Sequence, residues 1–259
     1  MQNKTKPLIL VTNDDGISAK GLRLLIERAK LFGKVIVVAP DSPQSAKSHS
    51  ITQHLPIEIK KIEEYDDYLE YSCSGTPVDC VKIAIHEIMK QKPDIVLSGI
   101  NHGVNTSVSV LYSGTMAAAI EGSINGITSC GFSVNNYKSE ADFSNAVPII
   151  DKIIKYLTDN KLPRNTSLNV NFPDVENQVP DGIKICRATN GNWQEKFVEA
   201  NNPFERKTFW ISGEFKNFEP QATDTDEYAI KHNYVSIVPI KVDFTDYNFI
   251  NNLKDDFLL

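Results

Sequence analysis

The chain lacks several features that mark common classes of protein. Its 259 residues include only four cysteines, none of which forms a C-x-x-C pair or stands at zinc-finger spacing from a histidine. We therefore expect free thiols in a reducing cytoplasm. No apolar run approaches the length of a membrane span, and the run near the N-terminus is too short for the core of a signal peptide.

An excess of basic residues and two familiar catalytic motifs are also missing. The chain carries 27 Lys and Arg against 33 Asp and Glu, a formal net charge of -6. Because binding to a nucleic-acid polymer requires a basic surface, we expect no such partner. There is no Gly-x-Ser-x-Gly elbow and no Walker glycine-lysine loop. A small anionic substrate, which needs only one local site, remains compatible with this composition.

The first 175 residues predict strands that alternate with helices. Continuous apolar runs at 8–12, 34–39 and 93–98 indicate strands buried on both faces, as in a parallel sheet. Helices are predicted at 20–32, after Thr76-Pro77 and around 112–122, and strands at 126–134 and 168–172. A helix over 140–157 is expected to be interrupted early by Pro148, and edge strands are expected within 51–72. This order predicts an α/β fold with a parallel-rich sheet.

The last third of the chain has a different character. After about residue 175 turn residues become frequent, helical patterns vanish, and strand-like pieces appear at 183–188, 206–211 and 234–244. We therefore predict a catalytic core over residues 1–175 and a β-rich extension over residues 176–259. The extension is expected to complete the core and to form a subunit contact.

Polar side chains follow three of the predicted strands. They are Asn13, Asp14 and Asp15 after the first, Ser42 or Ser45 after the second, and Asn101 and Asn105 after the third. Ligands of open parallel sheets bind outside the carboxyl ends of the strands, so we expect these groups to converge. Such oxygen ligands suit Mg²⁺, Mn²⁺ or Ca²⁺. One Asp-Asp-Gly is equally typical of a turn that caps a helix, and only the convergence of three clusters favours a metal site.

A second feature is the small polar segment Ser113-Gly114-Thr115 at the predicted start of a helix. Amides and hydroxyls at a helix N-terminus bind phosphate well, and Gly75-Thr76 offers the same groups. Alone, each is more often a simple cap. Beside a metal site they predict a phosphoryl group held between metal and helix. His102 is a weaker candidate for an acid or base.

These motifs together resemble the survival protein SurE family of metal-dependent nucleotidases. The resemblance covers about residues 8–135 through five motifs in order, and the C-terminal third more loosely. The matching segments are Thr12–Gly16, Ala39–Asp41 with Ser45, Gly75–Val81, Ser98–Asn105 and Tyr112–Gly122, then Thr223–Asp226 and Tyr234–Ile240.

The resemblance implies a Rossmann-like three-layer core and hydrolysis of nucleoside 5′- and 3′-monophosphates, with some action on short polyphosphate. It also implies one divalent metal per subunit, most readily Mg²⁺ or Mn²⁺, held by Asp14, Asp15, Ser45 and Asn101. Family members are homodimers or homotetramers that exchange C-terminal elements. The family usually has glycine after the metal-binding serine, whereas this chain has Ala46, which is strained if the position requires a positive φ.

The mechanistic hypothesis assigns Asp14, Asp15 and Asn101 to catalysis at the metal. Asn13, Asn105 and the segment Ser113-Gly114-Thr115 are assigned to the phosphate. Attack by water is favoured over a covalent phosphate on Asp14, because both carboxylates are committed to the metal. Two other interpretations stay open from the residues: a non-catalytic nucleotide- or metal-binding regulator on the same fold, and a nucleotide-sugar transferase.

Overall fold

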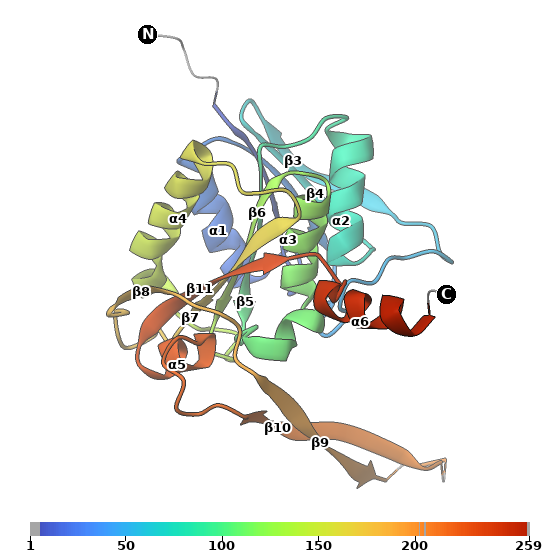
Figure 1. Cartoon of the computed structure of the whole chain (residues 1–259). Coiled ribbons are helices and arrows are strands. Elements are labelled where there is room, and N and C mark those ends of the chain that lie inside the picture. Colours follow the sequence, from blue (N-terminus) through green and yellow to red (C-terminus); the bar gives the residue numbers. More distant parts are fainter. Residues whose placement is uncertain (1–5, 202, 205, 258–259) are drawn as a thin grey trace.

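A nine-stranded sheet forms the centre of the molecule (Figure 1). The computed structural model describes residues 6–201, 203–204 and 206–257. The strand order is β3-β4-β2-β1-β5-β6-β7-β11-β8. The strands are β1 (Leu8–Thr12), β2 (Lys34–Pro40), β3 (Ile59–Tyr65), β4 (Tyr68–Cys73), β5 (Ile95–His102), β6 (Thr128–Val134), β7 (Thr166–Phe172), β8 (Gly182–Ile185) and β11 (Tyr234–Lys241). The neighbours from β4 to β7 are parallel, whereas β3 is antiparallel to β4 and β11 to β7.

Helices cover both faces of this sheet, which makes three layers. On one face lie α1 (Lys20–Lys30) and α4 (Val147–Asp159), and on the other α2 (Pro77–Ile83) and α3 (Gly114–Ile124) (Figure 1). A short π-helix, η1 (Ala84–Ile88), continues from α2, and short 3-10 helices, η2 (Ser107–Leu111) and η3 (Ser144–Ala146), precede α3 and α4. The Rossmann-like α/β class expected from the sequence is therefore confirmed.

Apolar patterning explains why these elements form and where the core lies. Residues 35–40 of β2 are all buried, as a strand covered on both faces requires. In α1 the buried residues recur at three- and four-residue spacing, which gives the helix one face toward the sheet. Two apolar clusters result, one under α1 and α4 and one under α2 and α3. All four cysteines are buried free thiols, as predicted.

The structure corrects the sequence prediction in several places. Pro148 does not interrupt a helix, because α4 begins at Val147 and the proline occupies its first turn, where no N–H is needed. Helices do occur after residue 175, namely α5 (Asp226–Lys231) and α6 (Tyr247–Phe257). The strands β9 (Gly191–Ala200) and β10 (Thr208–Asn217) are longer than the single piece expected at 206–211. The sequence of β9, with Glu195-Lys196 followed by Phe197-Val198, lacks the alternation of polar and apolar residues that marks a half-buried strand.

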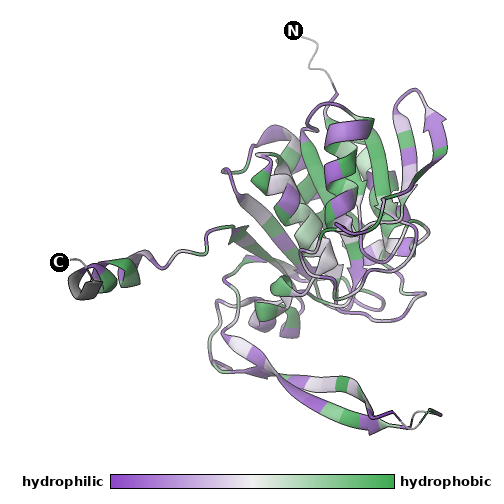
Figure 2. Cartoon of the chain, turned by 90° about the vertical axis from the view of Figure 1, so that its right-hand side faces the viewer, coloured by the Kyte–Doolittle hydropathy of each residue, from purple (hydrophilic) through white to green (hydrophobic). Residues whose placement is uncertain are grey.

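Two C-terminal segments stand apart from the three layers. Strands β9 and β10 form a separate antiparallel hairpin that hangs below the sheet (Figure 1), and α6 projects away from the body (Figure 2). By contrast, β8 and β11 extend the central sheet. Within the described ranges, the structure contains no helix that combines the length and apolarity needed to cross a bilayer.

Candidate functional site

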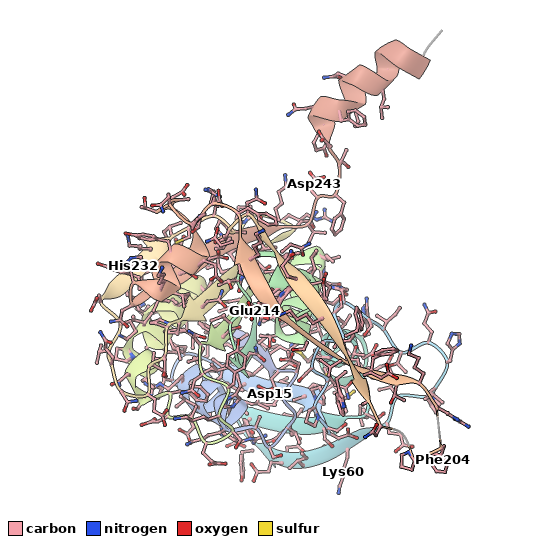
Figure 3. The ribbon with its side chains drawn as sticks, turned by 90° about the horizontal axis from the view of Figure 1, so that it is seen from below. Asp15, Lys60, Phe204, Glu214, His232 and Asp243 are labelled. Carbon is pink, nitrogen blue, oxygen red and sulfur yellow. The ribbon has the colours of Figure 1, made fainter. Side chains whose placement is uncertain are left out.

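The carboxyl ends of β1, β2 and β5 meet at the edge of the sheet that faces the β9–β10 hairpin. Figure 3 looks onto this side, with Asp15 in the core and Glu214 on the hairpin in front of it. Thr12 pairs with Ser98 across β1 and β5, so the loops that follow both strands leave the sheet side by side. A cleft of about 820 Å³ lies here, and Asp14, Ser45, Asn101, Asn105 and Ser113 are among its lining residues.

Asp14 is the most deeply buried acidic group of this site, with only 4% of its surface exposed. The hydroxyl of Thr115 donates a hydrogen bond to its Oδ1. Burial raises the pKa of Asp14 to about 6, against the hydrogen bond from Thr115, and the negative charge of Asp15 adds to the rise. Helix α3 approaches closely because residue 114 is glycine: a Cβ there would lie 2.7 Å from the Asp14 Cβ and 2.9 Å from its Oδ2.

Asp15 lies beside Asp14 but is only partly buried. Burial raises its pKa, and the neighbouring His102 opposes that rise. The His102 backbone N–H points at Asp15 Oδ2 at 3.4 Å, and the imidazole packs against Phe143 with ring centroids 5.1 Å apart. His102 therefore reaches the site mainly through its backbone, while its ring is held by an aromatic neighbour.

Asn13 shapes the turn that carries the two carboxylates. Its Nδ2 donates to the Gly16 carbonyl at 3.0 Å, and Gly16 has a φ of 101°, which favours glycine. Its Oδ1 is buried and has no hydrogen-bond partner among the described residues. A buried orphan acceptor next to two carboxylates is the kind of atom that a cation or a bound donor satisfies.

The loop after β2 brings Ser45 to the cleft and leaves Ser42 outside it. The Gln44 N–H donates to the Asp14 carbonyl at 2.7 Å, which ties this loop to the first one. Ser45 lines the cleft, whereas the Ser42 hydroxyl donates to the exposed carboxylate of Asp41 at 2.8 Å. Ala46 has a φ of 59°, so the position that usually holds glycine does adopt the left-handed conformation in this chain.

Both asparagines of the β5 loop are fixed by hydrogen bonds from their amide nitrogens. Asn101 Nδ2 donates to the Gly103 carbonyl at 2.7 Å, and Asn105 Nδ2 donates to the Ser133 hydroxyl at 2.9 Å. The backbone of Asn105 is held as well, because its N–H donates to Asn171 Oδ1 at 2.7 Å. With the nitrogens engaged, the two side-chain oxygens remain available as acceptors or ligands.

The start of α3 presents the donors expected of a phosphate site. Ser113 is the N-cap, and its hydroxyl oxygen accepts from the Met116 N–H at 3.0 Å while its own O–H is free to donate. At the start of α2 the situation differs. Thr76 and Asp79 form a capping box in which the Asp79 carboxylate accepts the Thr76 N–H at 2.9 Å. Gly75-Thr76 thus serves as a cap, and neither residue lines the cleft.

The donor set of this site fits a hard divalent cation. Within residues 6–201, 203–204 and 206–257 no three His, Cys, Asp or Glu side chains gather as a metal cluster. The other oxygen donors that line the cleft with Asp14 include the hydroxyls of Ser45 and Ser113 and the amides of Asn101 and Asn105. Oxygen-only donors suit Mg²⁺ and Mn²⁺. Such a cation would neutralise the two adjacent carboxylates, whose pKa values are raised, and would give a partner to the buried orphan oxygen, Asn13 Oδ1.

The hairpin side of the cleft was not predicted from the sequence. Trp193, Glu195 and Phe197 of β9 and Ile211 and Gly213 of β10 all line it. Their spacing of two residues along each strand is the available signal, since it places them on one face. This spacing alone does not place the residues at the cleft, because the pairing of these segments with one another and with the core depends on contacts distant in sequence.

The chain is similar to known proteins in both sequence and fold. The family model described as survival protein SurE matches residues 9–195. A protein named 5′-nucleotidase SurE from Phocaeicola vulgatus is 46% identical over 252 residues, 97% of both chains. A protein of the same name from Christiangramia forsetii is 50% identical over 254 residues, again 97% of both chains. The crystal structure of the SurE protein from Aquifex aeolicus superposes with a TM-score of 0.81 at 34% identity, covering 96% of this chain and 99% of that one. This chain therefore belongs to the survival protein SurE family.

Proposed function

We propose that the protein is a metal-dependent phosphomonoesterase that hydrolyses nucleoside 5′-monophosphates to nucleoside and phosphate. Relatives that span nearly its whole length are named 5′-nucleotidase SurE. The observation that carries the proposal is the closeness of buried Asp14 to the start of α3, where Asp14 and Ser113 line one cleft. We extend it to nucleoside 3′-monophosphates and short polyphosphate, which present the same terminal phosphate.

The proposed metal site consists of Asp14, Asp15, Ser45 and Asn101, holding one Mg²⁺ or Mn²⁺ per subunit. When bound, such a cation offsets the negative charge of the phosphate and acidifies water. Asp14 is oriented for this role by the Thr115 hydroxyl, and Asn101 by its hydrogen bond to the Gly103 carbonyl. Preset ligands of this kind lose little entropy on binding.

The phosphate oxygens are proposed to lie against the start of α3. The Ser113 O–H and the first backbone amides of the helix, at Gly114 and Thr115, donate to them, and the helix dipole favours their charge. Asn105 and Asn13 supply further polar groups at the strand ends. The Thr115 hydroxyl is engaged by Asp14, so its contribution to the phosphate is through the backbone.

Water is proposed to attack the phosphorus in line with the leaving nucleoside oxygen, so that a new P–O bond forms as the ester bond breaks. A covalent phosphate on Asp14 is the rival path. The stereochemical course of hydrolysis of a nucleoside 5′-phosphorothioate made chiral at phosphorus with oxygen isotopes distinguishes them. We expect inversion, the result of a single in-line displacement, and net retention would refute direct attack because it requires two displacements.

The activity itself is tested by phosphate release from adenosine monophosphate with Mn²⁺ or Mg²⁺. We expect release by the wild-type protein, none after chelation, and a loss of at least a hundredfold in Asp14→Asn, because the charge that binds the cation is gone. Equal rates in both proteins would favour the regulator. Release only from nucleoside-diphosphate sugars would favour the transferase. The names of the relatives support neither alternative.

We further propose that the chain is organised as a core over residues 1–175 and an oligomerisation extension over residues 176–259. Helix α6 stands away from the body with Phe249 and Leu253 exposed (Figure 2). We expect homodimers or homotetramers that exchange C-terminal elements, and such an exchange accounts for the position of α6. Light scattering on the full chain and on a chain truncated after residue 245 tests this, with a monomeric full-length protein as the contrary result. Four free thiols support a cytoplasmic location.

A further inference from the structure

The cleft at the strand ends has a second wall that the phosphate chemistry does not need. Its volume, about 820 Å³, lies in the range of pockets for whole cofactors and ligands rather than for one phosphate. The groups proposed for metal and phosphate all come from the core. Six further lining residues come from the β9–β10 hairpin, which lies in front of that edge of the sheet (Figure 3).

One face of the hairpin provides this second wall. In the antiparallel register Phe197 pairs with Ile211 and Glu195 with Gly213. Along β9, Trp193 lies two residues before Glu195 and four residues before Phe197. Residues two apart on a strand share a face, so the five residues Trp193, Glu195, Phe197, Ile211 and Gly213 point the same way. All five line the cleft, and we call them the hairpin wall.

Trp193 is the residue of the hairpin wall whose position is set most firmly. Its indole Nε1 donates to the Ser109 hydroxyl at 3.2 Å, which connects the hairpin to the core. Its ring also makes an edge contact with Phe215 at a centroid distance of 6.1 Å. Two independent contacts hold a large aromatic face at the cleft, and a face held in advance costs little entropy when a ligand stacks on it.

The core side of the cleft carries aromatic rings as well. Tyr112 and Tyr137 both line it, with 51% and 73% of their surfaces exposed. The Tyr137 ring lies against Gly103, where an added Cβ would come within 2.5 Å of it. Gly103 is two residues after Asn101, so this ring sits on the very loop that carries a proposed metal ligand. Flat apolar rings thus border the phosphate-binding groups from both sides.

We propose that Trp193 forms a nucleobase subsite, in which the base of the substrate stacks on the indole and faces Tyr137 or Tyr112 across the cleft. This inference rests on the proposed function, and it names the part of the substrate that the hairpin recognises. Stacking suits any base, because every base presents a π face. The hairpin wall holds the base, and the core holds the phosphate.

Comparison of adenosine monophosphate with ribose 5-phosphate tests the subsite. The two share phosphate and sugar and differ in the base. We expect wild-type kcat/KM to be roughly tenfold to a hundredfold higher for adenosine monophosphate, the usual contribution of one stacked base. Trp193→Leu should remove this preference through a higher KM and leave ribose 5-phosphate unchanged, while Trp193→Phe should retain part of it.

A matched control lies on the same hairpin. Trp210 of β10 pairs with Val198 of β9 and lies on the opposite face, 72% exposed and outside the cleft. Trp210→Leu should keep the base preference. Because the chain has only two tryptophans, Trp210→Phe leaves Trp193 as the sole indole emitter. Adenosine monophosphate should quench that emission, and ribose 5-phosphate should not.

Three results would overturn the subsite. They are equal wild-type kcat/KM for the two substrates, an equal loss of both activities in Trp193→Leu, and unchanged Trp193 emission at saturating adenosine monophosphate. If hydrolysis of ribose 5-phosphate persists in these cases, the phosphatase activity stands and only the base subsite fails. If the wild-type protein hydrolyses neither compound, the proposed function fails and the subsite with it.

Discussion

Replacing Asp14 with asparagine should abolish hydrolysis and at the same time stabilise the metal-free protein at neutral pH. The carboxyl is almost fully buried, and burial raises its pKa to about 6 from an ordinary 3.8. Since a tenfold change in an ionisation constant corresponds to about 1.4 kcal/mol, an ionised Asp14 costs the folded state about 3 kcal/mol. Asparagine has the same shape, keeps an oxygen for the Thr115 hydroxyl, and carries no charge.

The pH dependence of this gain follows from the direction of the shift. Below about pH 4 the carboxyl is protonated in both the folded and the unfolded chain, so the two proteins should be equally stable. Between about pH 4 and 6 the unfolded chain ionises first, and the folded wild-type protein loses stability relative to Asp14→Asn. Above about pH 6 the difference is complete, at about 3 kcal/mol or roughly 6–12 °C in melting temperature.

Urea unfolding in the presence of a chelator, from pH 4 to pH 8, measures this difference. Asp66→Asn is the matched control, because Asp66 is exposed in the turn between β3 and β4, and its replacement should change the free energy of unfolding by less than about 0.5 kcal/mol. Addition of Mn²⁺ should then stabilise the wild-type protein more than Asp14→Asn. Equal unfolding free energies of wild type and Asp14→Asn at pH 7.5 would refute the reasoning, as would a difference that persists at pH 4.

Three further changes have definite expected outcomes. Gly114→Ala places a Cβ 2.7 Å from that of Asp14 and should lower kcat/KM for adenosine monophosphate about a hundredfold; wild-type kinetics would contradict the close approach. Ala46 has a φ of 59°, a conformation that glycine adopts without strain and valine does not. Ala46→Gly should therefore keep the metal affinity measured by calorimetry, whereas Ala46→Val should weaken it and lower the stability by about 1–2 kcal/mol. Identical behaviour of the two variants would show that backbone strain at this position has no effect. Although burial opposes it, hydrogen bonds with His49 and Lys82 lower the pKa of Glu121 to about 2, so wild-type stability should fall between pH 4.5 and 2. Lys82→Met should reduce that fall by about 1 kcal/mol in acid unfolding, and an unchanged acid profile would show that the pair contributes nothing.

Sequence patterns were sufficient for the parts of the site that lie on neighbouring parallel strands. Asp14 and Asp15 follow β1, Ser45 follows β2 and Asn101 lies in the last residues of β5, and each strand was visible as a continuous apolar run. Once the sheet is parallel, its geometry alone brings these strand ends together. This logic does not tell which helix start binds phosphate, because Gly75-Thr76 and Ser113-Gly114-Thr115 offer the same groups. Only the structure shows that Thr76 and Asp79 form a capping box at the start of α2.

By itself, the sequence determined the α/β class, the order of the core elements and the segments that carry the proposed oxygen ligands, because these depend on periodicity within ten to fifteen residues. Tertiary structure alone decided what surrounds those ligands. The Thr115 hydroxyl meets Asp14 across about a hundred residues of chain, and Trp193 reaches Ser109 across 84. Such contacts leave no periodic trace in either partner, since each depends on how two distant segments pack. The second wall of the cleft and the burial of Asp14 are therefore properties of the folded chain.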